Sequence, residues 1–388
     1  MAAGAVVFHH SVAHAWPQYD NVPLVQVPLL AKLAHVMDGG VAVFFVLSGF
    51  LIYRPFVAAH LAGRPQMPAR RFYWRRLLRI VPAYWVALSF FWAIGQYHLG
   101  GPGQAWRYYA FAQIYDRNTV LGGIVPAWSL NTEISFYLLI PAYAWLLGRL
   151  AQAWAARGEG EQGRVARRAS VEGAAALMLF AAGYLARQVV SVADPGWRGL
   201  SFNWLLTNID FFAAGMVVAV LSAWAVAQPD RLRWTGALGR SPGACWAAAA
   251  VVFTWFAWQI GPAGFATGYR GGYWQLRAAV LALVSLLLLV PAVFGDQDRG
   301  AVRRALRWGP VQWLGTVSYG LYLWHLPFLD RLDTHTNPIT GVVEWKGWIS
   351  GTIHLPAALL VAFGFGLACA AASHYVVERP LQRFKDRI

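Results

Sequence analysis

The sequence predicts an all-α fold, a polytopic membrane helical bundle of about ten transmembrane helices. Apolar residues make up 58% of the 388 residues and charged residues only 13%, about half the charged share of a soluble domain. Such a surface must largely face lipid. The 21 Trp and 16 Tyr residues fit this environment, because their amphipathic rings settle at membrane–water interfaces. We expect helices because lipid cannot satisfy the edges of an open sheet.

Long apolar runs place the expected spans along the whole chain. We expect a single transmembrane domain over residues 1–388 with a truncated first helix. The first run meets His9 and His10 after Phe8, although a span needs ~20 apolar residues. The expected spans are residues 1–16, 40–58, 80–98, 127–148, 171–191, 204–226, 242–260, 273–294, 311–328 and 353–375.

The basic residues alternate between loops. Of the 32 Lys and Arg residues, 22 lie in the even-numbered loops and the C-terminal tail and 8 in the odd-numbered loops. The positive-inside rule therefore predicts a multi-pass protein of the cell membrane with both termini cytoplasmic. The net charge of +15 is spread over alternate loops, so we expect the lipid bilayer and no nucleic acid as a partner. Only Cys245 and Cys369 are present, so we expect no disulfide framework and no metal site.

Ionisable residues inside spans are costly and point to function. His9 and His10 lie toward the predicted outer end of the first span, and Glu133, Asp210 and His325 lie in the predicted outer half of three others. An imidazole oriented by a carboxylate can activate a hydroxyl as a general base. The alternative is that each residue makes an ordinary polar contact between helices.

Three arginines crowd the predicted cytoplasmic start of the third span: Arg75, Arg76 and Arg79. The spacing of Arg76 and Arg79 puts two guanidinium groups on one helix face. Such a pair can hold the phosphates of an anionic cytosolic donor. A positive-inside anchor or an anionic-lipid contact explains the same spacing.

A donor site inside and histidines outside favour chemistry carried across the bilayer. A transporter or flippase of sugars or lipid-linked solutes, with proton-relay carboxylates, would show much of the same pattern. A structural protein of an envelope complex is a third reading. Composition does not separate these classes.

Several segments resemble acyltransferase family 3, the membrane O-acetylases of surface polysaccharides. The matching segments are Val6 to His9, Gly40 to Ile52, Arg75 to Pro82, Trp128 to Tyr137 with its Trp-Ser-Leu-Asn-Thr-Glu, Ser318 to His325, and Glu378 to Leu381. They follow the family's order along the chain. Each motif is moderately specific alone, and together they are highly specific.

The resemblance implies an enzyme that transfers an acyl group, expected to be acetyl, from acyl-CoA to a hydroxyl. The acceptor would be a cell-envelope carbohydrate, a glycolipid or a natural product. The resemblance implies that His9 is the base or acyl relay, that Arg76 and Arg79 help to bind acyl-CoA, and that Glu133 supports the site. It implies no permanently bound cofactor, because acyl-CoA (expected to be acetyl-CoA) is the donor substrate.

Two positions depart from the family pattern. The family's first helix opens with Asp-Gly-Leu-Arg, and counting back from His9 to that arginine runs off the chain. Ala42 stands where the family often has an acidic residue or Asn. We expect a late-called start or a truncated member. His10 follows His9 directly, so the choice of base between them stays open, as do the acceptor, the acyl chain length and the oligomeric state.

Overall fold

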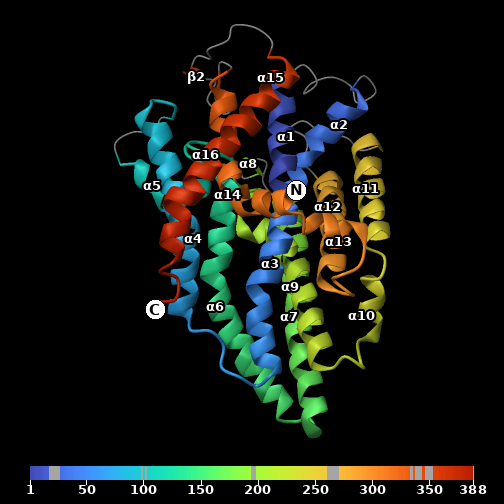
Figure 1. Cartoon of the computed structure of the whole chain (residues 1–388). Helices are drawn as coiled ribbons and strands as arrows, with labels where there is room; N and C mark the ends of the chain where they lie inside the picture. Colours follow the sequence, from blue (N-terminus) through green and yellow to red (C-terminus); the bar gives the residue numbers. More distant parts are fainter. Residues whose placement is uncertain are drawn as a thin grey trace.

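The computed structural model describes residues 1–16, 27–97, 99–100, 103–193, 198–259, 271–332, 335–336, 343–345 and 353–387. Most of these residues belong to helices that pack into one bundle (Figure 1). The helices are α1 (Ala2–Ala15), α2 (Leu29–Val36), α3 (Gly40–Leu61), α4 (Ala69–Ala93), α5 (Ala105–Tyr109), α6 (Trp128–Ala155), α7 (Gly160–Ala193), α8 (Arg198–Ser201), α9 (Leu205–Ala227), α10 (Arg233–Leu238), α11 (Pro242–Gln259), α12 (Gly271–Val293), α13 (Ala301–Leu306), α14 (Gly309–Asp330), α15 (Leu355–Leu359), α16 (Gly366–Ser373) and α17 (Arg379–Gln382).

Short irregular helical segments join several of these helices. Three 3₁₀ turns are η3 (Met37–Gly39), η4 (Gln113–Tyr115) and η5 (Val125–Ala127). Two π-helical stretches, η6 (Leu360–Phe365) and η7 (His374–Glu378), interrupt the last long helix. In the part of the chain that the structure describes, the only strands are β1 (His335–Thr336) and β2 (Val343–Trp345), which pair antiparallel.

The predicted all-α class is confirmed, and every predicted span overlaps a helix. Within the described ranges, six helical segments are long and apolar enough to cross a membrane. The figure of about ten spans stays a prediction, because α1, α4, α11 and α14 do not belong to this set. The six segments are Leu29–Leu61, Val125–Ala155, Gly160–Val192, Leu205–Ala227, Gly272–Val293 and Leu355–Gln382.

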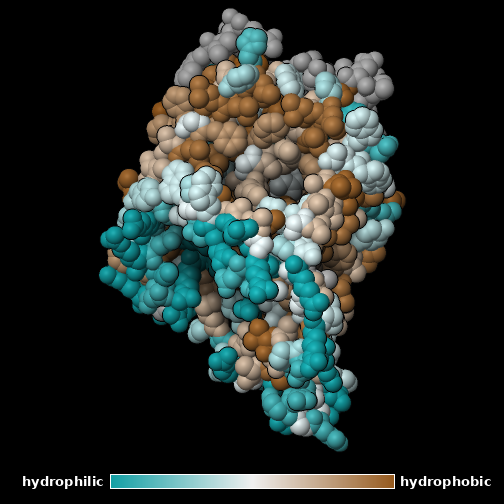
Figure 2. Space-filling view, turned by 45° about the vertical axis from the view of Figure 1, so that its right-hand side comes forward, coloured by the Kyte–Doolittle hydropathy of each residue, from teal (hydrophilic) through white to brown (hydrophobic). Residues whose placement is uncertain are grey.

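The surface fits a multi-pass membrane protein. Figure 2 shows hydrophobic residues gathered over the upper part of the visible face and hydrophilic residues over its lower part. Large apolar side chains project outward from these helices, among them Leu138 at 63% exposure and Leu360 at 72%. Lipid satisfies such side chains, whereas water would not.

Two glycines bring α3 and α9 into close contact at the centre of the bundle. A Cβ atom on Gly49 would lie 2.0 Å from the Phe212 carbonyl oxygen, and one on Gly215 would lie 2.0 Å from the Val46 carbonyl oxygen. Neither position can therefore carry a side chain. Small residues allow this backbone approach in membrane helix pairs. The contact fixes the face of α3 that carries the polar residues described below.

Candidate active site

His10 and His325 form the centre of the candidate site, although they are far apart in the sequence. His10 Nδ1 on α1 lies 2.9 Å from His325 Nε2 on α14, and the two rings stack with centroids 5.1 Å apart. His325 Nδ1 lies 3.1 Å from the Leu321 carbonyl oxygen. The sequence placed both histidines among the candidate catalytic residues, and the structure brings them together.

These contacts assign the tautomers of the pair in its neutral form. A carbonyl oxygen only accepts hydrogen bonds, so His325 Nδ1 carries a hydrogen and its Nε2 carries a lone pair. His10 Nδ1 must then donate to His325 Nε2. The Nε2 atom of His10 is left as the basic nitrogen. The structure thus supplies an imidazole that is oriented for proton transfer.

His9 presents a second basic nitrogen beside the first. Its Nδ1 lies 3.0 Å from the Ala34 carbonyl oxygen on α2, so His9 Nε2 carries the lone pair by the same reasoning. The rings of His9 and His10 lie 5.0 Å apart. Both imidazoles can accept a proton, and only His10 is hydrogen-bonded to another histidine among the described residues.

Sequence reasoning missed His14 and Asp330, which extend the histidine cluster. His14 Nε2 lies 3.2 Å from Asp330 Oδ1, and His14 Nδ1 donates to the His10 carbonyl oxygen at 2.8 Å. Tyr97 donates to Asp330 Oδ2 at 3.5 Å. A signal was present, because His10 and His14 are four residues apart and share a helix face. We call His9, His10, His14, His325 and Asp330 the histidine cluster.

Glu133 has a different partner from the one that the sequence predicted. Its carboxylate accepts a hydrogen bond from the Ser48 hydroxyl of α3. It also interacts electrostatically with Arg76 and with Tyr137, one turn further along α6. In the described ranges no hydrogen bond joins Glu133 to an imidazole. Asp330 is the carboxylate beside the histidine cluster, and elsewhere in the bundle Glu172 lies 2.6 Å from His60 Nδ1. The predicted depth was insufficient because it left the helix face undetermined.

Tyr322 lies between the histidine cluster and the part of α6 that carries Glu133. Its ring centroid lies 6.1 Å from that of His325, and its hydroxyl lies 2.7 Å from the Ser129 hydroxyl. Ser129 and Glu133 are one turn apart on α6. A line of polar side chains therefore runs from the histidine cluster to Glu133 and on to Arg76.

The arginine segment, Arg75, Arg76 and Arg79 on α4, divides into two parts. Arg75 Nη2 lies 2.5 Å from Asp386 Oδ1 in the C-terminal tail, and this guanidinium lowers the pKa of the exposed Asp386 carboxyl. Arg76 turns inward, with its guanidinium carbon 5.6 Å from the centre of the Tyr137 ring. Across the described residues no ion pair involves Arg76 or Arg79. Of the three arginines, only Arg75 is therefore held in an ion pair in the part of the chain that the structure describes.

Asp210 lies apart from the histidines. Arg187 on α7 grips it with two hydrogen bonds of 2.7 and 2.6 Å, and both side chains are buried. Arg187 lies inside α7 and within the predicted span 171–191. This bidentate ion pair connects α7 to α9. Because the two charges compensate each other, we interpret the pair as a structural contact.

Comparisons with known proteins agree with these features. An acyltransferase domain family matches residues 1–158, a range that contains His9, His10, Glu133 and the arginine segment. The chain is 24% identical over 359 residues to the peptidoglycan O-acetyltransferase OatA of Listeria monocytogenes, covering 89% of this chain and 51% of that protein. It is 28% identical over 114 residues to the putative peptidoglycan O-acetyltransferase YrhL of Bacillus subtilis, covering 29% of this chain and 15% of that protein.

The chain spans about half the length of the first of these relatives and a smaller part of the second. No solved structure gives a significant match. The family match and the similarity to the Listeria protein along most of the chain agree with the motifs read from the sequence. Over residues 1–158 the chain is similar to the acyltransferase domain family, and over most of its length it is similar to the Listeria protein.

Proposed function

We propose that this chain is an integral membrane O-acyltransferase. It transfers an acyl group, expected to be acetyl, from acyl-CoA to a hydroxyl of a cell-envelope glycan. The proposal depends above all on the His10–His325 hydrogen bond of 2.9 Å, which leaves His10 Nε2 as an oriented base. The names of the relatives support a cell-wall glycan as acceptor, since both are peptidoglycan O-acetyltransferases by name.

The chemical step needs one base and one leaving group. His10 Nε2 takes the proton of the acceptor hydroxyl while the hydroxyl oxygen attacks the thioester carbonyl carbon. The C–S bond then breaks, and the CoA thiolate takes the proton from His10. Transfer of the acyl group to the imidazole itself, followed by attack of the acceptor, gives the same products. His325 is a positioning residue, because it acts on the reaction only through the His10 ring.

The donor is proposed to enter at the other end of the polar line. Arg76 and Arg79 provide charged N–H groups for the phosphates of acyl-CoA. The orientation predicted from the basic loops would put the arginine segment at the cytoplasm, where acyl-CoA is made, and both termini on the same side. Glu133 is then a neighbouring negative charge that favours the charged form of Arg76.

The test uses the purified chain in lipid nanodiscs with radiolabelled acetyl-CoA and a soluble glycan acceptor. We expect release of free CoA in step with the appearance of label on the glycan. A transporter would move glycan across a sealed vesicle and release no CoA. Release of CoA without labelled glycan would contradict the proposed acceptor class.

A further inference from the structure

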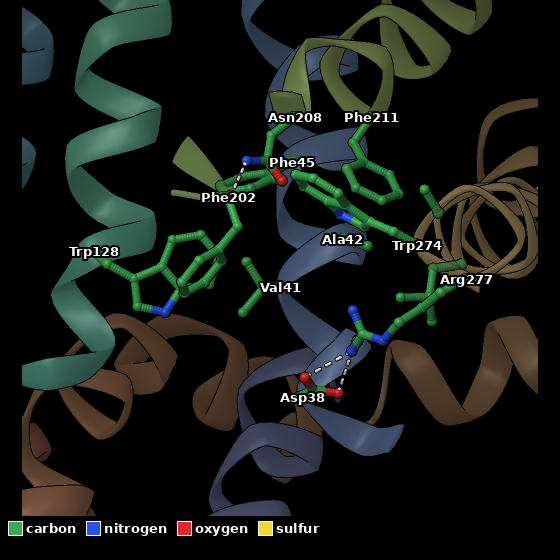
Figure 3. A pocket seen from close by; sticks show the side chains of 13 residues that line it. Asp38, Val41, Ala42, Phe45, Trp128, Phe202, Asn208, Phe211, Trp274 and Arg277 are labelled. Atoms are coloured by element: carbon green, nitrogen blue, oxygen red, sulfur yellow. Dashed lines mark hydrogen bonds and ion pairs between the residues drawn. The ribbon is translucent and has the colours of Figure 1, made fainter. Parts of the chain in front are cut away.

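The starting ends of four helices converge on a small cavity that none of the residues of the histidine cluster lines (Figure 3). Trp128 is the first residue of α6, Asn208 is in the first turn of α9, and Trp274 is in the first turn of α12. Asp38 lies just before α3. The lining residues are Asp38, Gly39, Val41, Ala42, Phe45, Trp128, Phe202, Asn208, Phe211, Trp274, Arg277, Ala278 and Leu281.

The cavity is close to the proposed chemistry on two sides. Trp128 precedes Ser129, which is hydrogen-bonded to Tyr322 beside His325. Asp38 follows Ala34, the hydrogen-bond partner of His9, by four residues. We therefore infer that a molecule with one group in this cavity can place another group at the histidine cluster.

The charged residues of the cavity neutralise each other. Arg277 Nη2 lies 2.6 Å from both carboxylate oxygens of Asp38, and Figure 3 shows this pair on one wall. Ala42, where the family often has an acidic residue, lines the same cavity, and Asp38 is one turn before it. A paired site of this kind favours a neutral group over a phosphate.

Asn208 defines the hydrogen bond that a bound group must make. Its Nδ2 donates to the carbonyl oxygens of Phe202 and Trp204 at 2.7 and 2.9 Å, so both amide hydrogens are used and the amide orientation is fixed. The Asn208 oxygen points into the cavity (Figure 3). It can accept a hydrogen bond from an N–H or O–H group of a ligand.

The rest of the cavity is aromatic and small. The Trp128 ring meets the rings of Phe45 and Phe202 edge to face, and Phe211 and Trp274 also line the cavity. The free volume is about 60 Å³, room for roughly four to six water-sized groups. That suits one substituent of a sugar ring, with the ring itself at the open side.

We propose that this cavity binds the acetamido group of an N-acetylated amino sugar in the acceptor glycan. The methyl group would contact the aromatic rings, and the N–H would donate to the Asn208 oxygen. An acetamido group is neutral and has four heavy atoms, which fits the paired charges and the volume. A plain sugar hydroxyl would leave the aromatic walls uncovered, and a thioester acetyl group has no N–H. The inference rests on the proposed function, because it names the acceptor of that reaction.

Two disaccharides with the same linkage test the proposal directly. Di-N-acetylchitobiose and cellobiose differ at the 2-position, which carries an acetamido group in the first and a hydroxyl in the second. Equilibrium dialysis against the full chain in nanodiscs measures the two dissociation constants. We expect di-N-acetylchitobiose to bind at least tenfold more tightly. Equal binding of the two by the wild-type chain overturns the proposal without any variant.

A cavity-filling variant locates the preference. Ala42→Val adds two methyl groups inside this cavity, and Ala250→Val adds the same two in a different, apolar cavity of about 500 Å³. We expect Ala42→Val to abolish the tenfold preference and Ala250→Val to keep it, with thermal unfolding confirming that each variant is folded. A preference that survives in a folded Ala42→Val chain overturns the assignment, as does competitive displacement of the disaccharide by acetyl-CoA.

Transfer measured in the same samples separates the two proposals. A binding preference without acetyl transfer to either disaccharide keeps the acetamido cavity and refutes the proposed function. Acetyl transfer to both disaccharides with equal binding keeps the enzyme and refutes the cavity assignment.

Discussion

The histidine cluster and the arginine segment differ in how the chain assembles them. His10 and His325 come from helices at opposite ends of the sequence, and one hydrogen bond of 2.9 Å joins them. Arg75, Arg76 and Arg79 share one helix, yet Arg75 pairs with Asp386 in the tail while Arg76 faces Tyr137 and Glu133. Residues that are close in sequence thus separate, and residues that are distant meet.

The difference shows which residues chemistry constrains most. The tautomer of His10 depends on that of His325, its hydrogen-bond partner. A substitution at either histidine therefore removes the oriented proton acceptor, His10 Nε2. Arg76 and Arg79 are proposed to contact a large ligand that other groups also hold. The loss of one of these contacts therefore weakens binding only in part. We therefore expect substitutions in the cluster to affect the rate and substitutions in the segment to affect the donor requirement.

Replacement of His10 should give the largest effect. His10→Ala removes the general base, so acyl transfer should fall by about 10²- to 10⁴-fold. His9→Ala should cost less, because His9 is not bonded to His325. The rate of labelled glycan formation at saturating acetyl-CoA checks this. Exposed His354 is the control, and His354→Ala should keep wild-type turnover. If His9→Ala were the more damaging change, the base would be His9.

Arg76→Lys tests the segment and should give the second largest effect. Lysine keeps the charge but cannot make two parallel hydrogen bonds to a phosphate. The KM for acetyl-CoA should rise about 10- to 100-fold, the range for a lost hydrogen bond to a charged group. The kcat should change little.

Arg70→Lys is the matched control, since Arg70 is exposed on the first turn of the same helix. An Arg76→Lys chain with the wild-type KM for acetyl-CoA would remove Arg76 from the donor site. It would leave the assignment of the histidine cluster intact.

Substitutions of His325 test whether its hydrogen bond positions the His10 ring. His325→Ala leaves His10 Nδ1 without its acceptor, and kcat should fall by up to about 10-fold for one lost hydrogen bond. His325→Gln supplies an amide oxygen and should recover most of the loss. Steady-state kinetics measures both, and the KM for acetyl-CoA should stay unchanged. Equal losses for Ala and Gln would mean that His325 fills space instead.

The sequence was sufficient for the helices but not for their faces. Apolar runs located every helix that carries a site residue, because lipid imposes one length scale on each span. Depth along a helix follows from the same count. It predicted a similar depth for His10 and His325, and the structure puts the two side chains in contact. The rotation of each helix depends on packing, which a single sequence does not reveal.

Glu133, Asp330 and Asp38 illustrate what rotation decides. Glu133 was expected at an imidazole and instead accepts from Ser48. Asp330 and Asp38 carried no signal, because each lies at a helix end where an acidic residue is unremarkable in sequence. The close contact of α3 and α9 at Gly49 and Gly215 sets the rotation of α3, and with it the faces of Ser48 and Ala42.

The smallest effect should come from the exposed contact between the segment and the tail. Asp386→Asn breaks the pair with Arg75, and exposed pairs contribute little, so amide hydrogen exchange in residues 379–387 should quicken by less than about threefold. Because the Arg75 guanidinium lowers the pKa of Asp386 below its ordinary 3.8, the contact is complete above that value. It is lost as the pH falls through the lowered pKa, so wild type and variant should converge only in strong acid.

Asp230→Asn, which breaks an exposed pair with Arg233, should leave tail exchange unchanged. If exchange in the wild-type tail already quickened near neutral pH, the Arg75–Asp386 pair would not hold the tail. Arg75 could then bind the donor together with Arg76.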